Sequence, residues 1–538
     1  RRQRQMCIRD SYYSGDWSIL AKKGAEGFYF FSDDDKMAIR LSADTRWGKK
    51  IIADLKMKVK ERRKYPLEVP KEEGGHFHDF FCPKHNLQFT FRWDNPKAHY
   101  CSACDKEWSG NKRYDWAWIY EVHMLNKDYL YQCMYLYLAT GQPEYADYIR
   151  TMLLDYAGKY SGWFEHNSGR QATDQHSGKA FAQSLDEANW ATKVAMAYGT
   201  IKPILSKKEI DFIEKGYLIP AATLLLHRPA GANWQMWHNS GLAALGIALE
   251  NDSIVDVAIN RDKYGYHFLI DKHKNDDGWI NEGSPHYHYY PLEALLFTAN
   301  AVRCRGIDLF DCDLHDMFVE PVKGTYPDLS FPAHSDGWYG ANLLSQSALY
   351  EVANTRYNDP FLQRVLELTY AQKKRLDAEA LLSNQRIDVS DEQLLQPSYS
   401  FNTSGFCLLR SDTRTVVLKF GGEGIGHGHL DKLSIAIHDG KRELISDFGT
   451  SGYGVPDYLK WYKRSLSHNT VTVDAKDQKR STGKITKFIP RSDGGYAEAE
   501  TVTAYPGVKM RRSLDLKGQY LQAVSYTHLR AHETVLDL

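Results

Sequence analysis

This sequence of 538 residues has no excess charge of either sign, because 68 Lys and Arg balance 68 Asp and Glu. A chain without a basic field is not expected to bind nucleic acid. The sequence also lacks any apolar run long enough to span a bilayer, and it has no low-complexity segment. The chain is long enough for more than one folded domain. Because it has no overall charge, a charged ligand would have to bind at a local site.

Cysteine is sparse, with eight in the whole chain, and four chemically related residues lie close together in sequence. Cys82 and His85 form one pair and Cys101 and Cys104 a second, with the spacing C-x2-H-x15-C-x2-C. Two pairs of this kind are typical of a closed, structural zinc site. A disulfide plus a free thiol, or packing alone, are the alternatives. We expect a short hairpin over residues 86–93, between the two pairs.

Aromatic residues, in contrast, are abundant: 35 Tyr, 22 Phe and 13 Trp. Most will be buried, but a surplus at the surface would suit stacking on sugar rings.

The two ends of the chain carry an unusual relationship. Residues 6–11 (MCIRDS) and 524–529 (VSYTHL) can be back-translated into the two strands of one DNA element. We therefore expect residues 1–11 and 524–538 to derive from a sequencing adapter, and we exclude them from fold reasoning. The native gene is expected to extend past both ends, so the absence of a signal peptide carries no information.

The remaining chain changes its pattern about two thirds of the way along. Residues 114–382 carry apolar residues at helical spacing, whereas the sequence from about residue 400 alternates and favours β-branched residues. We predict a multidomain α+β protein, a helical (α/α) toroid followed by an antiparallel β-sandwich truncated at its C-terminus. The predicted parts are an N-terminal segment with the Cys/His cluster (12–112), the toroid (113–385) and the incomplete β-sandwich (386–523).

Two motifs in the helical half place polar side chains where a helix begins after a loop. Residues 233–241 contain Asn233 and His238, and residues 277–290 contain Glu282 and Tyr287. Each has an ordinary alternative. Asn233 could only cap a helix, His238 could be a core histidine, Tyr287 and Tyr290 could simply pack, and Glu282 could cap or balance charge.

The strand half contains the most informative stretch, residues 426–434. His427 and His429 would share a face if this stretch were a strand. Asp447 and His468 follow, each beside another strand-like run. Histidines and a carboxylate from neighbouring strands can bind a divalent metal or move a proton. The alternatives are a solvent-exposed His427 and a metal-free hydrogen-bonded cluster of His429, Asp447 and His468.

With both halves considered, residues 75–523 resemble the heparinase II/III-like polysaccharide lyases. Within that group the chain is most similar to polysaccharide lyase family fifteen, of alginate oligosaccharide lyases and exolytic heparin/heparan sulfate lyases. The residues that carry the resemblance are the Cys/His pairs, residues 114–118 (YDWAW), residues 184–188 (SLDEA), the two helical motifs and the histidine-rich stretch.

The resemblance implies a carbon–oxygen lyase that cleaves a uronic acid polysaccharide or oligosaccharide by β-elimination. The expected cleavage is exolytic, from the end of the saccharide chain, and leaves unsaturated uronate ends. By position, His238 matches a base or a group that neutralises the uronate carboxylate, and Asn233 or Asn239 the accompanying amide. Tyr287, or Tyr290 in a shifted register, matches the tyrosine that protonates the leaving oxygen, and His427 matches a histidine reaching into the cleft from the β-domain.

The resemblance also implies zinc, but no organic cofactor, and a periplasmic or secreted bacterial protein. His429, Asp447 and His468 match a structural zinc site beside the cleft. The acidic saccharide is the expected partner, and its predicted contacts are Trp234, Trp237, Arg228, Glu282 and His288.

Two other functions compete with the lyase. A glycoside hydrolase on a similar toroid would need two carboxylates, for which Glu282 and Asp277 are candidates. A non-catalytic carbohydrate-binding protein would need the aromatic residues for binding. Its function would not change when His238, Tyr287 and His427 are replaced. Among lyase substrates, heparin or heparan sulfate would need several basic contacts, for which Arg228, Arg170 and Lys179 lie near candidate cleft segments, and alginate would need fewer.

Overall fold

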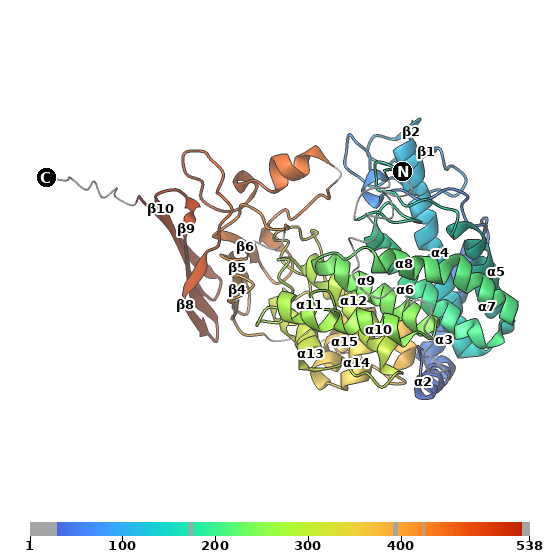
Figure 1. Ribbon diagram of the computed structural model, residues 1–538. Helices are drawn as coiled ribbons and strands as arrows, with labels where there is room; N and C mark the ends of the chain where they lie inside the picture. The colour runs from blue at the N-terminus through green and yellow to red at the C-terminus, as the bar shows by residue number, and fades with distance from the viewer. Residues whose placement is uncertain (1–29, 172–175, 391–395, 423–425, 454, 530–538) are drawn as a thin grey trace.

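The computed structural model describes residues 30–171, 176–390, 396–422, 426–453 and 455–529, and helices precede the sheet along the chain (Figure 1). The described residues form fourteen α-helices: α2 (Asp33–Asp44), α3 (Arg46–Arg62), α4 (Lys112–Thr140), α5 (Pro143–Tyr160), α6 (Ser184–Ile201), α7 (Lys207–Ile213), α8 (Ile219–Leu226), α9 (Ala232–Ala248), α10 (Asp252–Asn260), α11 (Tyr266–His273), α12 (Pro285–Arg303), α13 (Cys312–Val319), α14 (Ser347–Tyr357) and α15 (Pro360–Gln372).

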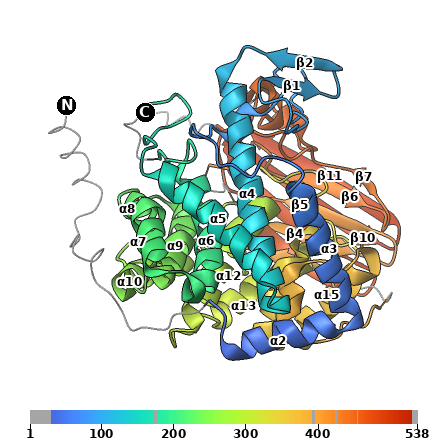
Figure 2. The same cartoon turned by 90° about the vertical axis from the view of Figure 1, so that its right-hand side faces the viewer.

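The helices pack around a shared core, which confirms the predicted helical toroid (Figure 2). Nearly every residue of α6 and α9 is buried, the pattern of inner helices covered on all sides. Ser206 caps α7 through a capping box with Glu209. A π-helical turn, Glu214–Leu218, separates α7 from α8.

The C-terminal part is an antiparallel sheet that curls, as predicted for the β-domain. Its strands run in the order β11-β10-β9-β4-β5-β6-β7, with β3 on β4 and β8 on β9. The strand-like run beside His468, residues 470–474, forms no regular strand, so the strand expected there is wrong. The strands are β3 (Tyr399–Phe401), β4 (Phe406–Arg410), β5 (Thr415–Lys419), β6 (Ser434–His438), β7 (Glu443–Ile445), β8 (Lys484–Arg491), β9 (Gly494–Tyr505), β10 (Val508–Lys517) and β11 (Tyr520–Leu529).

The N-terminal part combines helices with a small hairpin. Helices α2 and α3 lie within the predicted segment 12–112 and pack on the helical core. The hairpin is formed by β1 (Ala98–Cys101) and β2 (Lys106–Ser109), not by residues 86–93, so that prediction is wrong. Residues 86–93 instead contribute isolated bridges, because Thr90 pairs with Tyr100 beside β1.

Of the residues expected to derive from an adapter, 1–11 and 530–538 lie outside the described residues. Residues 524–529 complete strand β11, which pairs with β10 at the end of the sheet.

Aromatic packing joins the two large domains. Trp279, in the loop before α12, meets Phe401 and Phe406 of the sheet edge-on, at ring-centroid distances of 5.9 and 5.6 Å. Arg410 of β4, 8% exposed, donates to the backbone carbonyls of Lys323 and Thr325. A buried guanidinium whose hydrogen bonds are satisfied by another domain's backbone fixes the two domains in one arrangement.

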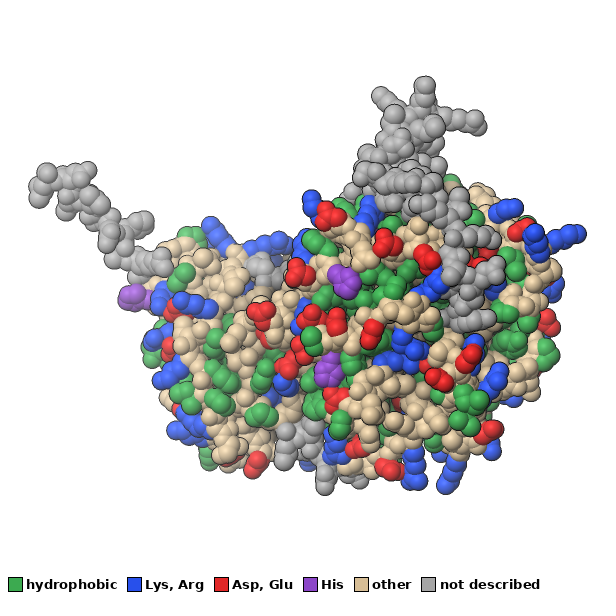
Figure 3. Space-filling view, turned by 60° about the horizontal axis from the view of Figure 1, so that its bottom comes forward, with side chains coloured by type: hydrophobic (Ala, Val, Ile, Leu, Met, Phe, Trp, Pro, Cys, Tyr) green, Lys and Arg blue, Asp and Glu red, His purple; other side chains and the backbone are tan. Residues whose placement is uncertain are grey.

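The molecular surface is mixed in character. On the face shown in Figure 3, basic and acidic side chains are interspersed and no large area carries a single sign. Among the helices of the described residues, none combines the length and hydropathy that a bilayer-spanning segment needs.

Buried neutral histidines should make the fold sensitive to acid. Burial lowers the pKa of His123, His238 and His334 to about 3. In the unfolded chain these groups bind protons below about pH 6.5, so the unfolded state takes up more protons and stability falls as the pH drops from 6.5 toward 3. Each histidine should cost about 1 kcal/mol of unfolding free energy per pH unit in that window.

Urea unfolding at pH 7, 6 and 5 measures this slope. His123→Asn should reduce the slope by one histidine's share, while lowering stability at pH 7 through lost packing. A stability that is flat between pH 7 and 5 would contradict the account.

Candidate active site

One buried carboxylate, Asp336, lies where the helical part meets the β-domain. It accepts hydrogen bonds from His427 Nδ1 at 2.9 Å and from His429 Nε2 at 2.8 Å. The Tyr458 hydroxyl donates to it at 2.8 Å. Burial alone would raise the pKa of Asp336, but the hydrogen bonds from the two histidines outweigh burial and hold the pKa below its usual range. Asp336 is therefore an anion that fixes the orientation of both imidazoles.

Local backbone geometry brings Asp336 to this place. Gly449 has φ +59°, and a Cβ there would lie 2.0 Å from the carbonyl oxygen of Gly337. Thr450 N–H donates to that same carbonyl at 3.0 Å, and Thr450 pairs with Trp338. Glycine at 449 thus allows the loop after β7 to lie directly against the loop that carries Asp336.

Tyr287 and His427 stack face to face beside Asp336. Their ring centroids lie 3.5 Å apart with an interplanar angle of 18°. The hydroxyl of Tyr287 contacts the hydroxyl of Tyr453, which lies 3.1 Å from His427 Nδ1. Burial raises the pKa of Tyr287, so its phenol is protonated at neutral pH. The arrangement unites a proton donor from α12 with an imidazole from the β-domain.

Asn233 and Glu282 form the next layer of the site. Glu282, 1% exposed, accepts from the Asn233 backbone N–H at 2.9 Å and from Asn233 Nδ2 at 2.6 Å. Its carboxylate also lies 3.8 Å from His427 Nε2. Because an amide nitrogen carries two hydrogens, Asn233 keeps one donor for a ligand. Glu282 orients Asn233, and its burial leaves little room for the predicted direct contact with substrate.

His238 lies deeper, on α9, and is fully buried. Its Nε2 is 3.1 Å from the hydroxyl of Ser184, the first residue of α6. Because burial lowers its pKa to about 3, the imidazole is neutral near pH 7. It can therefore act through hydrogen bonding but carries no positive charge in the free protein.

Asn239 and Tyr290 are the alternatives for the catalytic amide and tyrosine. Their side chains contact other residues than His427 and Asp336. Asn239 Nδ2 donates to the Tyr264 carbonyl at 2.7 Å, and its oxygen accepts from Gln235 at 2.8 Å. Both ends of that amide thus have protein partners. Tyr290 packs 5.2 Å from the ring of Trp237 and lines a pocket of about 300 Å³ beside the site. The geometry favours Asn233 and Tyr287 over these alternatives.

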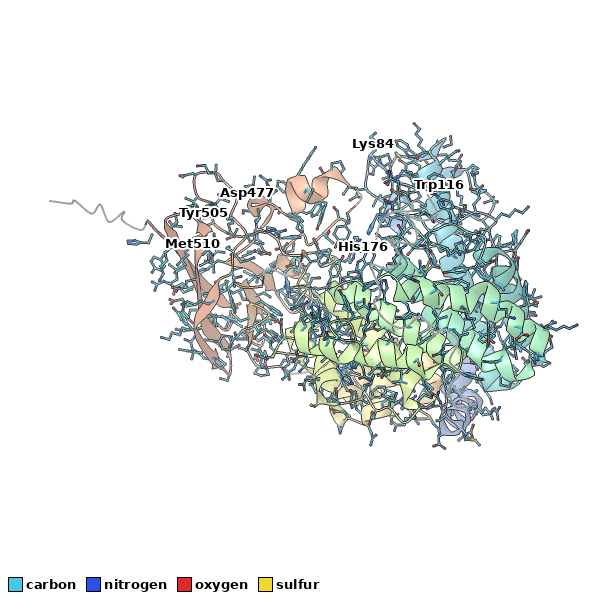
Figure 4. All side chains as sticks on the ribbon, in the orientation of Figure 1. Lys84, Trp116, His176, Asp477, Tyr505 and Met510 are labelled. Atoms are coloured by element: carbon cyan, nitrogen blue, oxygen red, sulfur yellow. The ribbon has the colours of Figure 1, made fainter. Side chains whose placement is uncertain are left out.

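The predicted substrate contacts divide by burial. Trp237 is fully buried against Tyr290, and His288 is fully buried with its nitrogens 3.2 Å from Ile280 N–H and 2.9 Å from the Met317 carbonyl. Neither can reach a saccharide, which corrects those two predictions. Trp234 is half-buried, with its ring 4.8 Å from that of His176, which Figure 4 labels between the two large domains.

Each of the three basic residues nominated for sulfate binding already has a partner within the protein. Arg228, 5% exposed, contacts Glu165 at 2.5 Å. Arg170 pairs with Glu73 at 3.2 Å. Lys179 donates to the Ser161 carbonyl at 3.2 Å. Two of the three positive charges are therefore already balanced within the protein.

Near the site, the β-domain holds a group that could bind a metal. Asp431, Asp447 and His468 offer ligand atoms that lie within 4.8 Å of one another. His429, the predicted third ligand, lies beside this group, with its ring centroid 5.3 Å from that of His468. Asp431 is in contact with Lys419 and lies 2.9 Å from Lys432, so its charge is already balanced. His429 Nδ1 and His468 Nε2 are buried without a hydrogen-bond partner, which suits metal ligation by those nitrogens.

The second possible metal group is the predicted Cys/His cluster, here called the knuckle (Cys82, His85, Cys101 and Cys104). His85 Nδ1 lies 3.9 Å from Cys82 Sγ and 3.8 Å from Cys101 Sγ. Cys82 and Cys104 sulfurs are 3.9 Å apart, far beyond the 2.0 Å or so of a disulfide. The structure thus has free thiols here, not the disulfide alternative.

Four residues of the site had not been singled out in the sequence. Asp336, Tyr453 and Tyr458 surround His427, and His78 of η2 (Phe77–Asp79) meets the Tyr453 ring edge-on at 5.2 Å. Asp336 follows Ser335, which has φ +56°, but no spacing in the sequence marks it. Tyr453 and Tyr458 lie in an aromatic stretch whose pattern is as typical of core residues as of active-site residues.

Comparisons with known proteins agree with the fold and the resemblance. Residues 90–318 match the family model "Alginate lyase", and residues 394–524 match "Heparinase II/III-like, C-terminal". An alginate lyase of Stenotrophomonas maltophilia is 27% identical over 447 residues, 73% of this chain and 58% of that protein. An exo-oligoalginate lyase of Saccharophagus degradans is 25% identical, over 74% of this chain and 59% of its own.

Solved structures share the architecture at low identity. Heparinase III superposes with a TM-score of 0.59 at 13% identity, covering 97% of this chain and 74% of that one. A heparan sulfate lyase of Pedobacter heparinus gives a TM-score of 0.55 at 14% identity, covering 92% and 79%. The chain therefore resembles the heparinase II/III-like polysaccharide lyases, as predicted, and it spans somewhat under 60% of the length of the curated relatives it matches.

Proposed function

We propose that this chain cleaves a uronic acid polysaccharide or oligosaccharide by β-elimination at the Tyr287–His427 pair. The observation that carries the proposal is the stacked pair itself, which places a phenol and an imidazole 3.5 Å apart between the two domains. Support also comes from two family models and from curated relatives that are alginate lyases.

The proposed reaction assigns each proton to a side chain. His427 donates Nδ1–H to Asp336, so its Nε2 has a free lone pair and takes the C5 proton. The C5–H electron pair forms the C4–C5 double bond as the C4–O bond breaks. The Tyr287 hydroxyl gives its proton to the leaving oxygen. The products are an unsaturated uronate end and a saccharide with a new hydroxyl.

The weakly acidic C5 proton can leave only if the uronate carboxylate is stabilised as charge develops on it. Asn233, held by Glu282, and neutral His238 are the proposed hydrogen-bond donors. Fixed donors in a buried site stabilise developing charge without having to reorient. Their role is to bind and orient the carboxylate next to the reacting pair.

We propose that the substrate is a uronate polymer of the alginate type, without dense sulfation. We propose that the chain cleaves this polymer from its end. Arg228 and Arg170 are paired with carboxylates, which leaves fewer cations for sulfate groups. The curated relatives include an exo-oligoalginate lyase. A chain that meets such a polymer would act in the periplasm or outside the cell.

We further propose zinc at both metal-binding groups. The knuckle supplies three sulfurs and one imidazole nitrogen, and the β-domain group would use His429, Asp447 and His468. In the β-domain a bound ion would hold the histidine loop that carries His427. Residues of the chain, and not the ion, perform the proton transfers.

The hydrolase alternative is not supported by geometry. Asp277 accepts hydrogen bonds from the backbone of Thr403 and Ser404, so it serves the turn between β3 and β4. Mass spectrometry of the products from an alginate oligosaccharide distinguishes the reactions. Elimination gives an unsaturated product whose mass is lower by one water than that of the corresponding hydrolysis product. If every product has the mass expected for hydrolysis, the lyase proposal is refuted.

A further inference from the structure

The knuckle has the dimensions of a tetrahedral metal site. For ligands about 2.3 Å (sulfur) and 2.0 Å (nitrogen) from one ion, the edges of a tetrahedron are roughly 3.5–3.8 Å. Three of these edges, Cys82–His85, Cys101–His85 and Cys82–Cys104, are 3.8–3.9 Å long, which is close to this range. The four ligand atoms are therefore already gathered at nearly the size of a tetrahedral metal site.

A donor beside one of the sulfurs adds a second sign of a metal ligand. Trp108 Nε1 donates to Cys104 Sγ at 3.4 Å. The Cys104 sulfur therefore accepts a hydrogen bond, as an anionic metal ligand does.

The knuckle also contacts the β-domain at the edge of the active site. Asn86, directly after His85, has φ +54° and donates from Nδ2 to the Ser451 carbonyl at 2.9 Å. Ser451 precedes Tyr453 by two residues. In Figure 1 the orange segment that follows Tyr453 reaches toward the N-terminal part with β1 and β2, and Figure 4 labels Lys84, which lies between Cys82 and His85 in sequence, on the facing side.

A chain of ring contacts runs in parallel with this hydrogen bond. Phe81, next to Cys82, lies 6.2 Å from His78, and the His78 ring lies 5.2 Å from that of Tyr453. Tyr453 in turn contacts Tyr287 and His427. Two routes therefore connect the knuckle to the reacting pair, through residues more than 350 positions apart in sequence.

We propose that a divalent, thiolate-preferring metal ion in the knuckle closes this side of the active site by holding Asn86 and His78 against the Tyr453 loop. The ion is remote from the reacting atoms, and its effect passes through the position of Tyr453. Asn86 and His78 are positioning residues. The effect on turnover rests on the proposed function, whereas metal binding and loop protection do not.

The test compares three variants of this chain. Cys104→Ser removes a ligand, Asn86→Ala removes the contact to Ser451 but keeps every ligand, and Asn95→Ala is the control. Asn95 belongs to the same N-terminal region, and its amide donates to Glu107 at 3.4 Å. The readouts are metal per chain by mass spectrometry, hydrogen exchange of peptides covering residues 449–453, and kcat/KM on alginate oligosaccharide.

Cys104→Ser should lose one metal ion per chain and gain exchange over residues 449–453. Asn86→Ala should keep its metal, show the same gain in exchange and lose about tenfold in kcat/KM, equivalent to one lost hydrogen bond. Asn95→Ala should match the parent in all three readouts.

Full metal content in Cys104→Ser would overturn the metal site. Unchanged exchange in Asn86→Ala, with metal retained, would overturn the coupling to Tyr453. If the parent protein cleaves no uronate polymer, the proposed function fails by itself, and the metal and exchange results still decide on the knuckle.

Discussion

Replacing Tyr287 with phenylalanine is expected to lower kcat by about 10³-fold while the protein stays folded. The substitution removes one hydroxyl, the group that protonates the leaving oxygen, and keeps the ring that stacks on His427. Burial keeps this phenol protonated, so it is ready to act as an acid in the free protein. Substrate binding, measured as KM, should change little because the stacked ring remains.

Tyr290→Phe is the matched control, since Tyr290 lies one turn along α12 and packs on Trp237. It should retain activity within a few-fold of the parent. Steady-state kinetics on one substrate measures both variants. If Tyr290→Phe is the inactive one and Tyr287→Phe is active, the register assigned to the tyrosine is wrong.

Replacing Asp336 with asparagine is expected to lower kcat by about 10²-fold or more, although Asp336 itself touches no substrate in the proposed reaction. The carboxylate accepts from His427 and His429 together. An amide offers only one acceptor oxygen, and its NH₂ group would face a donor. His427 then loses the fixed orientation that presents Nε2 to the C5 proton, as expected when a carboxylate that orients a catalytic histidine is replaced.

Two comparisons separate this positioning role from a general loss of stability. Tyr458→Phe removes a different donor to Asp336, leaves both histidine contacts and should cost less than tenfold in kcat. Asp336→Asn should also bind the β-domain metal more weakly, because His429 is held for ligation by the same carboxylate. Normal kcat and normal metal affinity in Asp336→Asn would refute the role.

The sequence was informative where a local pattern determines structure. The apolar spacing of α5 predicts that helix because α5 buries one continuous face. The change to alternating residues near 400 locates the sheet for the same reason. The knuckle follows from the spacing of four ligand residues, since each pair forms within a few residues of chain.

Other parts depend on contacts that no local pattern encodes. His427 and His429 were expected to converge along a strand, but residues 426–433 form no regular strand among those described, and the two imidazoles meet on Asp336, more than 90 residues earlier. Trp237 and His288 occur in polar motifs yet are core residues, because α9 is buried on nearly every side and α12 buries the face that carries His288. Tyr453 reaches the site only through the loop that Gly449 permits.

The most direct test of the account follows ultraviolet absorbance of unsaturated uronate during incubation with alginate oligosaccharide, heparan sulfate, heparin, chondroitin sulfate and hyaluronan. A folded, metal-loaded parent protein and a His427→Ala variant are assayed side by side. The account predicts rising absorbance, highest on alginate, and its loss in His427→Ala. Equal rates in the parent and His427→Ala, or saturated products with no absorbance from a polymer that is visibly degraded, would contradict it.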